Sequence, residues 1–253
     1  MMVTPTGRAS RVVVVTGAGS GLGRAMAVRL LEAGHHVVLV GRNARSLDDT
    51  AAGHERAAVF VCDVSSAESV HELFGWVSAQ FGRLDVLVNN AGTFGPSGSV
   101  DEIDPQAWSE TVATNLTGVF LCAREAVRIM KAQTPRGGRI INNGSISAHT
   151  PRPASAAYTA TKHGVSGLTK SISLDGRDFD ICCSQIDIGN AATDMTAGFA
   201  HSARQADGST RPEPTFDPIH VADAVAHLVE LPLDVSVPTM TIMANRMPYM
   251  GRG

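Results

Sequence analysis

The sequence predicts an α/β protein with one doubly wound parallel sheet and helices on both of its faces. Short apolar runs, suited to strands buried on both faces, alternate with segments of helical periodicity along the whole chain. The spacing between the runs is that of βαβ units with right-handed crossovers. At 253 residues the chain can bury a sizeable core and still form one domain, so we expect a single domain over 1–253.

The first predicted strand contains four consecutive valines, and the other elements follow it in alternation. Strands are expected at 12–15, 36–40, 57–62, 84–88, 139–143, 181–186 and 238–243. Helices are expected at 24–33, 44–53, 66–81, 105–131, 155–178 and 221–230. Ser65 or Ser66 can cap the third helix, and Asp104 followed by Pro105 is a typical helix start.

One long segment, 194–218, has no strong period. Its part at 205–214 has little apolar content and two prolines, which predicts that it does not stay ordered alone. A loop of this length in a compact domain is more often functional than neutral, so we interpret 194–218 as a substrate lid. A disordered surface insertion is the alternative interpretation.

The composition excludes several classes of partner. Charged residues make up 18% and the formal net charge is -3, with no basic stripe for nucleic acid. Residues 1–10 form a polar tail without the apolar core of a signal peptide, and no apolar run approaches a membrane span. We therefore expect a cytoplasmic protein with no membrane partner. The four cysteines are expected to be buried free thiols, and the nine histidines show no metal-ligand pairing, so no metal site is expected.

The glycine-rich stretch TGAGSGLG at 16–23 lies between the first strand and the first helix. Glycines let the backbone approach a phosphate closely, and free N–H groups at a helix N-terminus point toward it. Spaced glycines alone are a weak signal. Here the strand before them and the helix after them favour dinucleotide binding.

Tyr158 and Lys162 are four residues apart on a predicted helix, so they share one face. A lysine cation beside the phenol should lower the tyrosine pKa by roughly 1–3 units, which would make it a proton donor and acceptor near neutrality. A surface Tyr–Lys pair is the alternative for an isolated motif. Ser145 and the NNAG stretch at 89–92 follow other strands at the same sheet edge, which opposes that alternative.

These motifs together resemble the short-chain dehydrogenase/reductase family over essentially the whole chain. The resemblance rests on TGAGSGLG at 16–23, Asp63, NNAG at 89–92, Asn115, Ser145 and YTATK at 158–162. It implies a single-domain Rossmann-type fold and an NAD(P)(H)-dependent oxidoreductase that interconverts a ketone and a secondary alcohol, 3-oxoacyl compounds included. It also implies a homotetramer or a homodimer.

The resemblance assigns roles to individual residues. Tyr158 would transfer the proton, and Lys162 would hold the nicotinamide ribose. Ser145 would hydrogen-bond the carbonyl oxygen, and Asn115 would hold a water that links Lys162 to solvent. The cofactor would contact Thr16, Gly17, Gly19, Ser20, Gly21, Leu22, Gly23, Gly41, Arg42, Asp63, Val64, Asn89, Ala91, Gly92, Tyr158, Lys162, Ile188 and Thr193.

The chain departs from the family pattern in two places. Ile188-Gly189 stands where the family has Pro-Gly, which leaves the geometry of that loop open although Thr193 is retained. The carboxyl end is rich in methionine, for which core filling is the default interpretation, with a subunit contact or a substrate wall as alternatives.

The end of the second strand bears on the choice of cofactor. Enzymes that use NAD typically carry an acid there for the ribose 2′-hydroxyl, whereas this chain has Gly41 and Arg42. An arginine can pair with a 2′-phosphate, so we expect NADP(H) ahead of NAD(H).

Two other function classes were weighed. A hydrolase built on Ser145 and His149 lacks the G-x-S-x-G turn and is rejected. A catalytically silent nucleotide-binding regulatory or scaffold protein would need no proton-handling set, so Asn115, Ser145, Tyr158 and Lys162 favour an enzyme. The substrate walls are expected to be mostly apolar, at Phe94, His149, Pro151, Pro153, Met195 and Phe199.

Overall fold

The computed structural model describes residues 10–198 and 201–249, and its centre is one parallel sheet of seven strands. The strand order is β3-β2-β1-β4-β5-β6-β9, so the direction of progress through the sheet reverses between β1 and β4. The strands are β1 (Val12–Thr16), β2 (His36–Gly41), β3 (Ala57–Val61), β4 (Val86–Asn89), β5 (Gly138–Asn143), β6 (Ile181–Gly189) and β9 (Thr239–Met243). All seven predicted strands are confirmed, with ends that shift by up to three residues.

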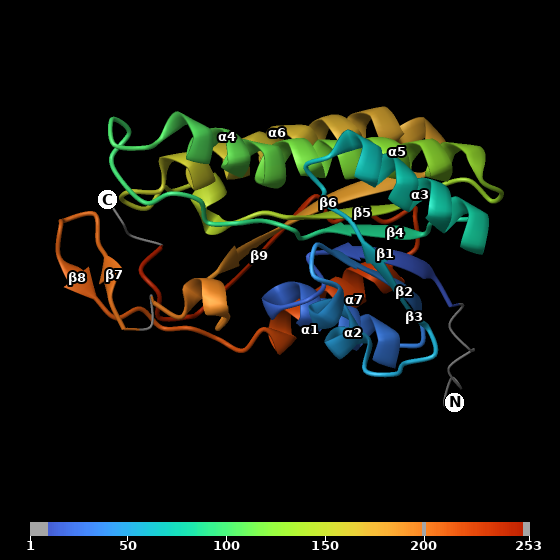
Figure 1. Ribbon diagram of the computed structural model, residues 1–253, viewed down its shortest axis with the longest axis horizontal. Helices are drawn as coiled ribbons and strands as arrows, with labels where there is room; N and C mark the ends of the chain where they lie inside the picture. Colours follow the sequence, from blue (N-terminus) through green and yellow to red (C-terminus); the bar gives the residue numbers. More distant parts are fainter. Residues whose placement is uncertain (1–9, 199–200, 250–253) are drawn as a thin grey trace.

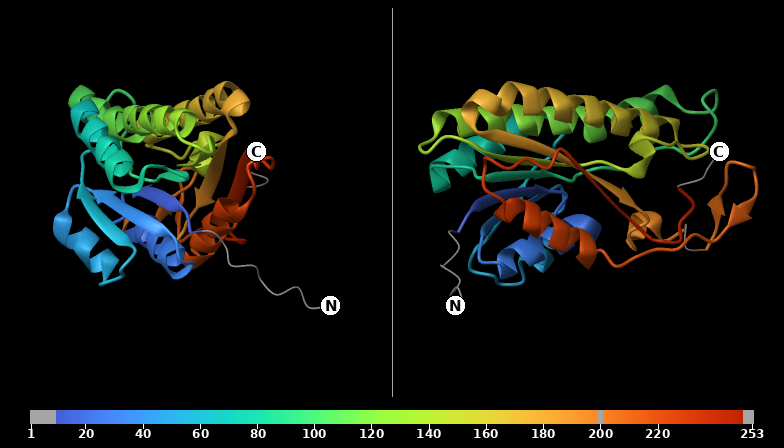
Figure 2. Two further views of the ribbon diagram at one scale, coloured as in Figure 1. Left: turned by 90° about the vertical axis from the view of Figure 1, so that its right-hand side faces the viewer. Right: turned by 180° about the vertical axis from the view of Figure 1, so that it is seen from behind.

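Helices cover both faces of the sheet, which confirms the doubly wound arrangement (Figure 1, Figure 2). One face carries α1 (Gly21–Glu32), α2 (Ala44–Ala51) and α7 (Ile219–Glu230). The other carries α3 (Ala67–Phe81), α4 (Pro105–Val112), α5 (Gly118–Ala132) and α6 (Ala156–Gly176). Each layer encloses its own apolar core against the sheet, and all five residues of β1 are buried.

The expected helix at 105–131 is present but not regular. Asp104 caps it, since its carboxylate accepts a hydrogen bond from the Ala107 N–H at 3.2 Å, and Pro105 occupies the first turn. A π-helical segment, Ala113–Thr117, separates α4 from α5. Such segments are frequent at functional sites, and this one contains Asn115.

The described part of the segment 194–218 contains regular structure that the sequence did not predict. It contains a short antiparallel hairpin of β7 (Ala203–Arg204) and β8 (Thr210–Arg211), which projects from the end of the sheet where the strands terminate (Figure 1). Ala203 and Glu213 are buried. A buried polar anchor at Glu213 thus stands where apolar burial is scarce, and the order of 205–214 in solution stays a prediction.

The cysteines, the helix lengths and the amino-terminal tail can also be compared with the expectations. All four cysteines are free and buried, as predicted. Within 10–198 and 201–249, no helix is long and apolar enough to cross a membrane. The expected tail at 1–10 lies almost wholly outside the described residues.

Candidate active site

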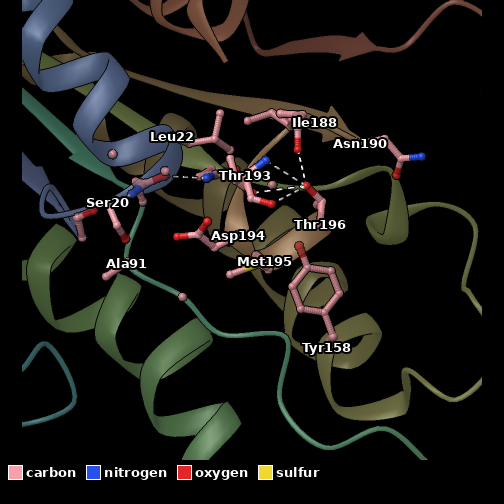
Figure 3. Close-up of a pocket in the computed structure, with 18 of the residues that line it drawn as sticks. Ser20, Leu22, Ala91, Tyr158, Ile188, Asn190, Thr193, Asp194, Met195 and Thr196 are labelled. Carbon is pink, nitrogen blue, oxygen red and sulfur yellow. Dashed lines mark hydrogen bonds between the residues drawn. The ribbon is translucent and has the colours of Figure 1, made fainter. Parts of the chain in front are cut away.

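A groove runs along the carboxyl edge of the sheet. It lies between the loops that follow the neighbouring strands β1 and β4. Two cavities of about 220 Å³ and about 480 Å³ form it, and both are lined by Gly17, Ala91 and Gly92. Figure 3 shows Ser20 and Ala91 on one side of the smaller cavity and Tyr158 on the other. The strand order reverses at this point, and open α/β sheets bind their ligands at such a position.

The glycine turn forms one wall of the groove, together with the start of α1. Gly17 has a positive φ of 66°, and a Cβ there would lie 2.9 Å from the Ala91 Cα. A Cβ on Gly23 would lie 2.0 Å from the Gly17 carbonyl oxygen, so only glycine allows the helix to approach the strand this closely. Ser20, Gly21 and Leu22 also line the smaller cavity, at the N-terminus of α1. This geometry suits a phosphate group.

Three residues expected at the cofactor are turned away from the groove. The Thr16 hydroxyl accepts hydrogen bonds from the Asn90 and Ala91 N–H groups at 2.9 and 3.0 Å, so it holds the loop after β4. Asn89 is buried, and its amide donates to Asn142 Oδ1 at 3.0 Å. Gly19 faces α2, since a Cβ there would lie 2.4 Å from the Ser46 hydroxyl. These three residues therefore pack against the elements that form the groove and do not line it.

Tyr158, Lys162 and Ser145 meet at the end of the smaller cavity. Tyr158 and Lys162 share a face of α6, with the lysine Nζ 5.5 Å from the centre of the phenol ring. Nζ donates a hydrogen bond to the Asn143 carbonyl oxygen at 2.7 Å. Ser145 follows β5, and its side chain hydrogen-bonds Tyr158. The structure brings these three residues together, and their catalytic roles stay predictions.

The pKa of Tyr158 shifts in the direction opposite to the prediction. Burial raises the pKa of the Tyr158 phenol, while the Ser145 hydrogen bond and the Arg152 charge oppose that rise and Asp187 adds to it. Burial lowers the pKa of Lys162 to about 8, against the effect of Asp187. The expected lowering of the Tyr158 pKa was therefore wrong for the structure, because desolvation outweighs the favourable contacts.

Asn115 lies buried in the π-helical segment. Its Oδ1 accepts from the Thr93 N–H at 2.8 Å, and its Nδ2 donates to the Thr93 carbonyl oxygen at 2.7 Å. Nδ2 also donates a longer hydrogen bond, of 3.4 Å, to the Thr161 hydroxyl on α6. The side chain thus fixes the loop after β4 against α6. Its assignment as a water-holding residue stays a prediction.

The larger cavity forms the opposite end of the groove. Gly41, Arg42, Asp63 and Val64 line it, as expected for an adenosine site. Hydrogen bonds from Ser65 lower the pKa of Asp63, and Arg42 contributes to the lowering. Arg42 is exposed and stands beside Gly41, whose lack of a side chain leaves this corner open.

Comparison with known proteins identifies the family. The description "short chain dehydrogenase" matches residues 11–203. The chain belongs to the short-chain dehydrogenase family. It is 40% identical to a 3beta-hydroxysteroid dehydrogenase of Mediterraneibacter gnavus, over 74% of this chain and 68% of the relative. It is 38% identical to a cis-4-hydroxycyclohexanecarboxylate dehydrogenase of Sinomonas cyclohexanicum, over 87% of this chain and 89% of the relative.

Solved structures agree with this assignment. An actinorhodin polyketide ketoreductase with NADPH superposes with a TM-score of 0.82 at 30% identity, covering 92% of this chain and 96% of that chain. A 3-ketoacyl-(acyl-carrier-protein) reductase from Brucella melitensis with NADH gives 0.81 at 25% identity, with the same coverage. The seven-stranded dinucleotide fold and the oxidoreductase class are therefore established for this short-chain dehydrogenase.

A third cavity of the short-chain dehydrogenase, of about 50 Å³, lies beside Ser145 and Tyr158. Phe94 stacks on the Tyr158 ring with centroids 5.1 Å apart, and Met195 forms another wall. Both were expected as substrate walls, and both line this cavity. His149, Pro151 and Pro153 are not among the described residues that line this cavity, and Phe199 lies outside the described residues.

The loop that lacks the family proline is held by a buried polar cluster. Asn190 adopts a positive φ of 57°, and its side chain contacts Arg152 at 2.9 Å and Glu213 at 2.8 Å. Arg152 donates two hydrogen bonds to the Glu213 carboxylate, at 3.0 and 2.6 Å. Gln205 donates a further one at 2.9 Å. The cluster ties the loop after β6 to the base of the hairpin.

The methionine-rich carboxyl end packs beneath the same loop. Met247 is only 5% exposed and forms a small core with Ile146 and Ala244. A Cβ on Gly189 would lie 2.7 Å from the Met247 sulfur. Core filling, the default interpretation, is confirmed for Met247.

Three residues near the groove were missed by sequence reasoning. Asn90 and Asn143 line the smaller cavity, and their side chains hydrogen-bond at 2.8 Å. Asp187 is fully buried against Ser145. The NNAG motif contained a signal for Asn90, but strand register decides which asparagine faces the groove.

Proposed function

We propose that this chain is an NADP(H)-dependent oxidoreductase that interconverts a ketone and a secondary alcohol, with Tyr158, Lys162, Ser145 and Asn115 as its proton-handling set. The observation that carries the proposal is the convergence of Ser145, Tyr158 and Lys162 at one end of a groove whose other end suits an adenosine. A dinucleotide would span the two cavities, with its pyrophosphate at the glycine turn and α1.

The fit to a nicotinamide dinucleotide rests on the groove itself. The glycines at 17 and 23 leave backbone exposed where a Cβ would clash, and the N-terminus of α1 faces the same space. When bound, the cofactor supplies the hydride chemistry. The protein's part is to orient the two reactants and to handle the proton.

The proton chemistry is assigned to neighbouring side chains. Tyr158 lines the cavity of about 50 Å³ beside Ser145, where its hydroxyl would donate a proton to a substrate oxygen in reduction and receive one in oxidation. The Ser145 hydroxyl would donate a hydrogen bond to the same oxygen and stabilise negative charge on it. Lys162 would bind ribose hydroxyls from its position behind the Tyr158 ring.

Arg42 supports NADP(H) over NAD(H). Its guanidinium lines the adenosine end of the groove, and Gly41 offers no carboxylate to repel a phosphate. The similar solved structures are described as complexes with NADPH, NADH or NADP, so this choice rests on Arg42.

The walls support an apolar, compact carbonyl substrate. Phe94, Ile146, Ile188 and Met195 surround the space beside Tyr158, and the paired Arg152 closes one side. Relatives act on a hydroxysteroid and on a hydroxycyclohexanecarboxylate, both with an alcohol on a six-membered ring. We therefore place alicyclic ketones first among the candidates, with 3-oxoacyl thioesters second.

A carbonyl panel tests this function. Oxidation of NADPH and of NADH is measured with cyclic ketones, oxosteroids and a 3-oxoacyl thioester, and Tyr158→Phe is the matched control. We expect turnover with NADPH that Tyr158→Phe abolishes, while the variant still binds NADPH in a fluorescence titration. NADPH binding without turnover of any carbonyl or alcohol would favour the silent nucleotide-binding protein instead.

We also propose that the chain forms a homotetramer or a homodimer. The outer face of α5 and α6 carries a groove that includes Phe120, Val127, Leu168 and Ile172, and Phe120 is 47% exposed. Light scattering of the wild type and of Phe120→Asp tests the proposal, with a smaller particle expected for the variant.

A further inference from the structure

Asp187 is a fully buried carboxylate directly beneath the candidate active site. It belongs to β6, and its Oδ1 accepts hydrogen bonds from the Ser145 N–H at 2.9 Å and from Gln185 Nε2 at 2.7 Å. Its Oδ2 lies 2.8 Å from His149 Nε2. Oδ1 thus accepts from two N–H donors, and Oδ2 faces a ring nitrogen of His149 that donates in the Nε2–H tautomer. The His149 side chain is 45% exposed and stands between this carboxylate and solvent.

The backbone before Ser145 is shaped around this carboxylate. A Cβ on Gly144 would lie 2.1 Å from Asp187 Oδ1, so the backbone rests on the carboxylate where a side chain would otherwise stand. The Ser145 hydroxyl in turn accepts a hydrogen bond from the Ser147 N–H at 3.1 Å and interacts with Tyr158. The position of the Ser145 hydroxyl therefore depends on Asp187.

Asp187 also lies close to Lys162. The lysine Nζ is bonded to the Asn143 carbonyl oxygen, and Asn143 pairs in register with Ile186, the residue before Asp187. The charged and titratable groups around this carboxylate are Lys162 and Tyr158 on α6, His149 after the short helix Ile146–Ala148, and Arg152 in the following loop. A negative charge here favours the lysine cation and disfavours a phenolate.

We propose that Asp187 is a positioning residue, whose carboxylate holds the Ser145 backbone in place and whose charge keeps Tyr158 and Lys162 in their protonated forms. These are the forms from which a ketone would be reduced, so the catalytic consequence rests on the proposed function. The electrostatic part stands by itself. It agrees with the directions found for both groups, since Asp187 raises the pKa of Tyr158 and opposes the lowering at Lys162.

The tyrosine content of the chain allows a direct test without cofactor or substrate. The sequence has two tyrosines, Tyr158 and Tyr249. In a Tyr249→Phe background, the ultraviolet absorbance of tyrosinate against pH reports the ionisation of Tyr158 alone. Asp187→Asn keeps an oxygen that can accept from the Ser145 N–H and removes the charge. We expect the Tyr158 ionisation to move to lower pH in this variant, because a negative charge that disfavours the phenolate is removed.

Asp194→Asn in the same background is the matched control. Asp194 is an exposed acid that lines the smaller cavity, and it does not figure among the charges that act on Tyr158. We expect its titration to follow that of the parent. Circular dichroism at each pH identifies the range in which all the variants are folded. Should Asp187→Asn fail to fold, Asp187→Ser removes the same charge with a smaller side chain and is measured in the same way.

Two outcomes would overturn the inference. One is an unchanged Tyr158 ionisation in folded Asp187→Asn, and the other is an equal shift in Asp194→Asn.

Turnover gives a separate readout. With the ketone found in the panel, the loss of reduction rate at high pH should begin at lower pH in Asp187→Asn than in the wild type. A merely structural role would lower the rate at every pH alike. A shifted titration in a protein that reduces no carbonyl would refute the proposed function and leave the electrostatic assignment intact.

Discussion

Lys162 is deeply buried, and its ammonium donates a hydrogen bond to the Asn143 carbonyl oxygen. Burial lowers its pKa to about 8, so the ammonium loses its proton as the pH rises through that value. Below pH 8 the side chain is a cation that can bind ribose hydroxyls and stabilise negative charge beside Tyr158. Above it, both effects disappear.

We therefore expect the rate of ketone reduction by NADPH, measured as kcat/KM, to fall as the pH rises through about 8. Lys162→Arg keeps a cation over the whole range, because an arginine does not deprotonate in proteins. This variant should be slower throughout and should lack the fall near pH 8. A fall of the same size at the same pH in Lys162→Arg would assign it to another group.

Arg42 provides the second test at the level of a single side chain. Arg42→Ala should weaken NADPH binding by about 1.5–3 kcal/mol, the value of a hydrogen bond to a charged group, and should leave NADH binding nearly unchanged. Arg45→Ala is the control, since Arg45 is an exposed residue of α2 that does not line the larger cavity. Calorimetric titration with both nucleotides measures the difference. Equal losses for NADPH and NADH would mean that Arg42 only stacks on the adenine.

At the scale of elements, the buried pair of Arg152 and Glu213 anchors the base of the hairpin in the segment 194–218. Burial alone would raise the pKa of Glu213, but hydrogen bonds from Arg152, Asn190 and Gln205 lower it to about 2. A carboxyl whose pKa is lowered on folding stabilises the protein above its unfolded pKa. That stabilisation is lost as the pH falls from about 4.5 toward 2.

This linkage predicts the behaviour of Glu213→Gln. At pH 7 the variant should unfold at lower urea concentration, with a loss of about 3 kcal/mol, because the buried Arg152 loses the negative charge of the carboxylate that accepts its two hydrogen bonds. Its stability should then change less than that of the wild type between pH 5 and 3. Asp207→Asn, in an exposed ion pair of the same hairpin, should behave like the wild type. A Glu213→Gln curve parallel to that of the wild type would contradict the assignment.

The same segment divides into a part at the groove and a part away from it. Thr193, Asp194, Met195 and Thr196 line the smaller cavity, whereas the hairpin lines neither cavity of the groove. Hydrogen exchange measured with and without NADPH should show new protection at 193–198 and little change at 203–211. Unchanged exchange at 193–198 would remove the lid interpretation and leave an anchored loop.

Local patterns along the chain predicted most of these elements. Apolar runs of four to six residues predicted every strand of the sheet, and caps such as Asp104 predicted helix starts, because both depend on neighbours in sequence. The π-helical turn at Asn115 was not predictable from spacing, since it depends on the packing of two helices. The hairpin was missed because its stability comes from Glu213, whose partner Arg152 is 61 residues away.

At the scale of the whole molecule, long-range contacts set the details of the site. Motif order predicted which loops would meet at the carboxyl edge of the sheet. It did not predict that Asn89 would face the core and Asn90 the groove, because that depends on how the strands pair. The position of Asp187 beside the site could not be predicted for the same reason, because its bonds to Ser145 and His149 span 42 and 38 residues.

The buried Met247 has a practical consequence for handling the protein. Its side chain supports the loop at Gly189 and the start of the helix after Ser145, so the carboxyl end is part of the foundation of the catalytic pocket. An affinity tag or surface tether attached there is expected to disturb the packing of Met247 against Ile146 and Ala244. Proteolytic trimming back to Ala244 would inactivate preparations that still look intact by circular dichroism. Ser10, at the entry to β1, lies at the opposite edge of the sheet, and purification or immobilisation should use that end.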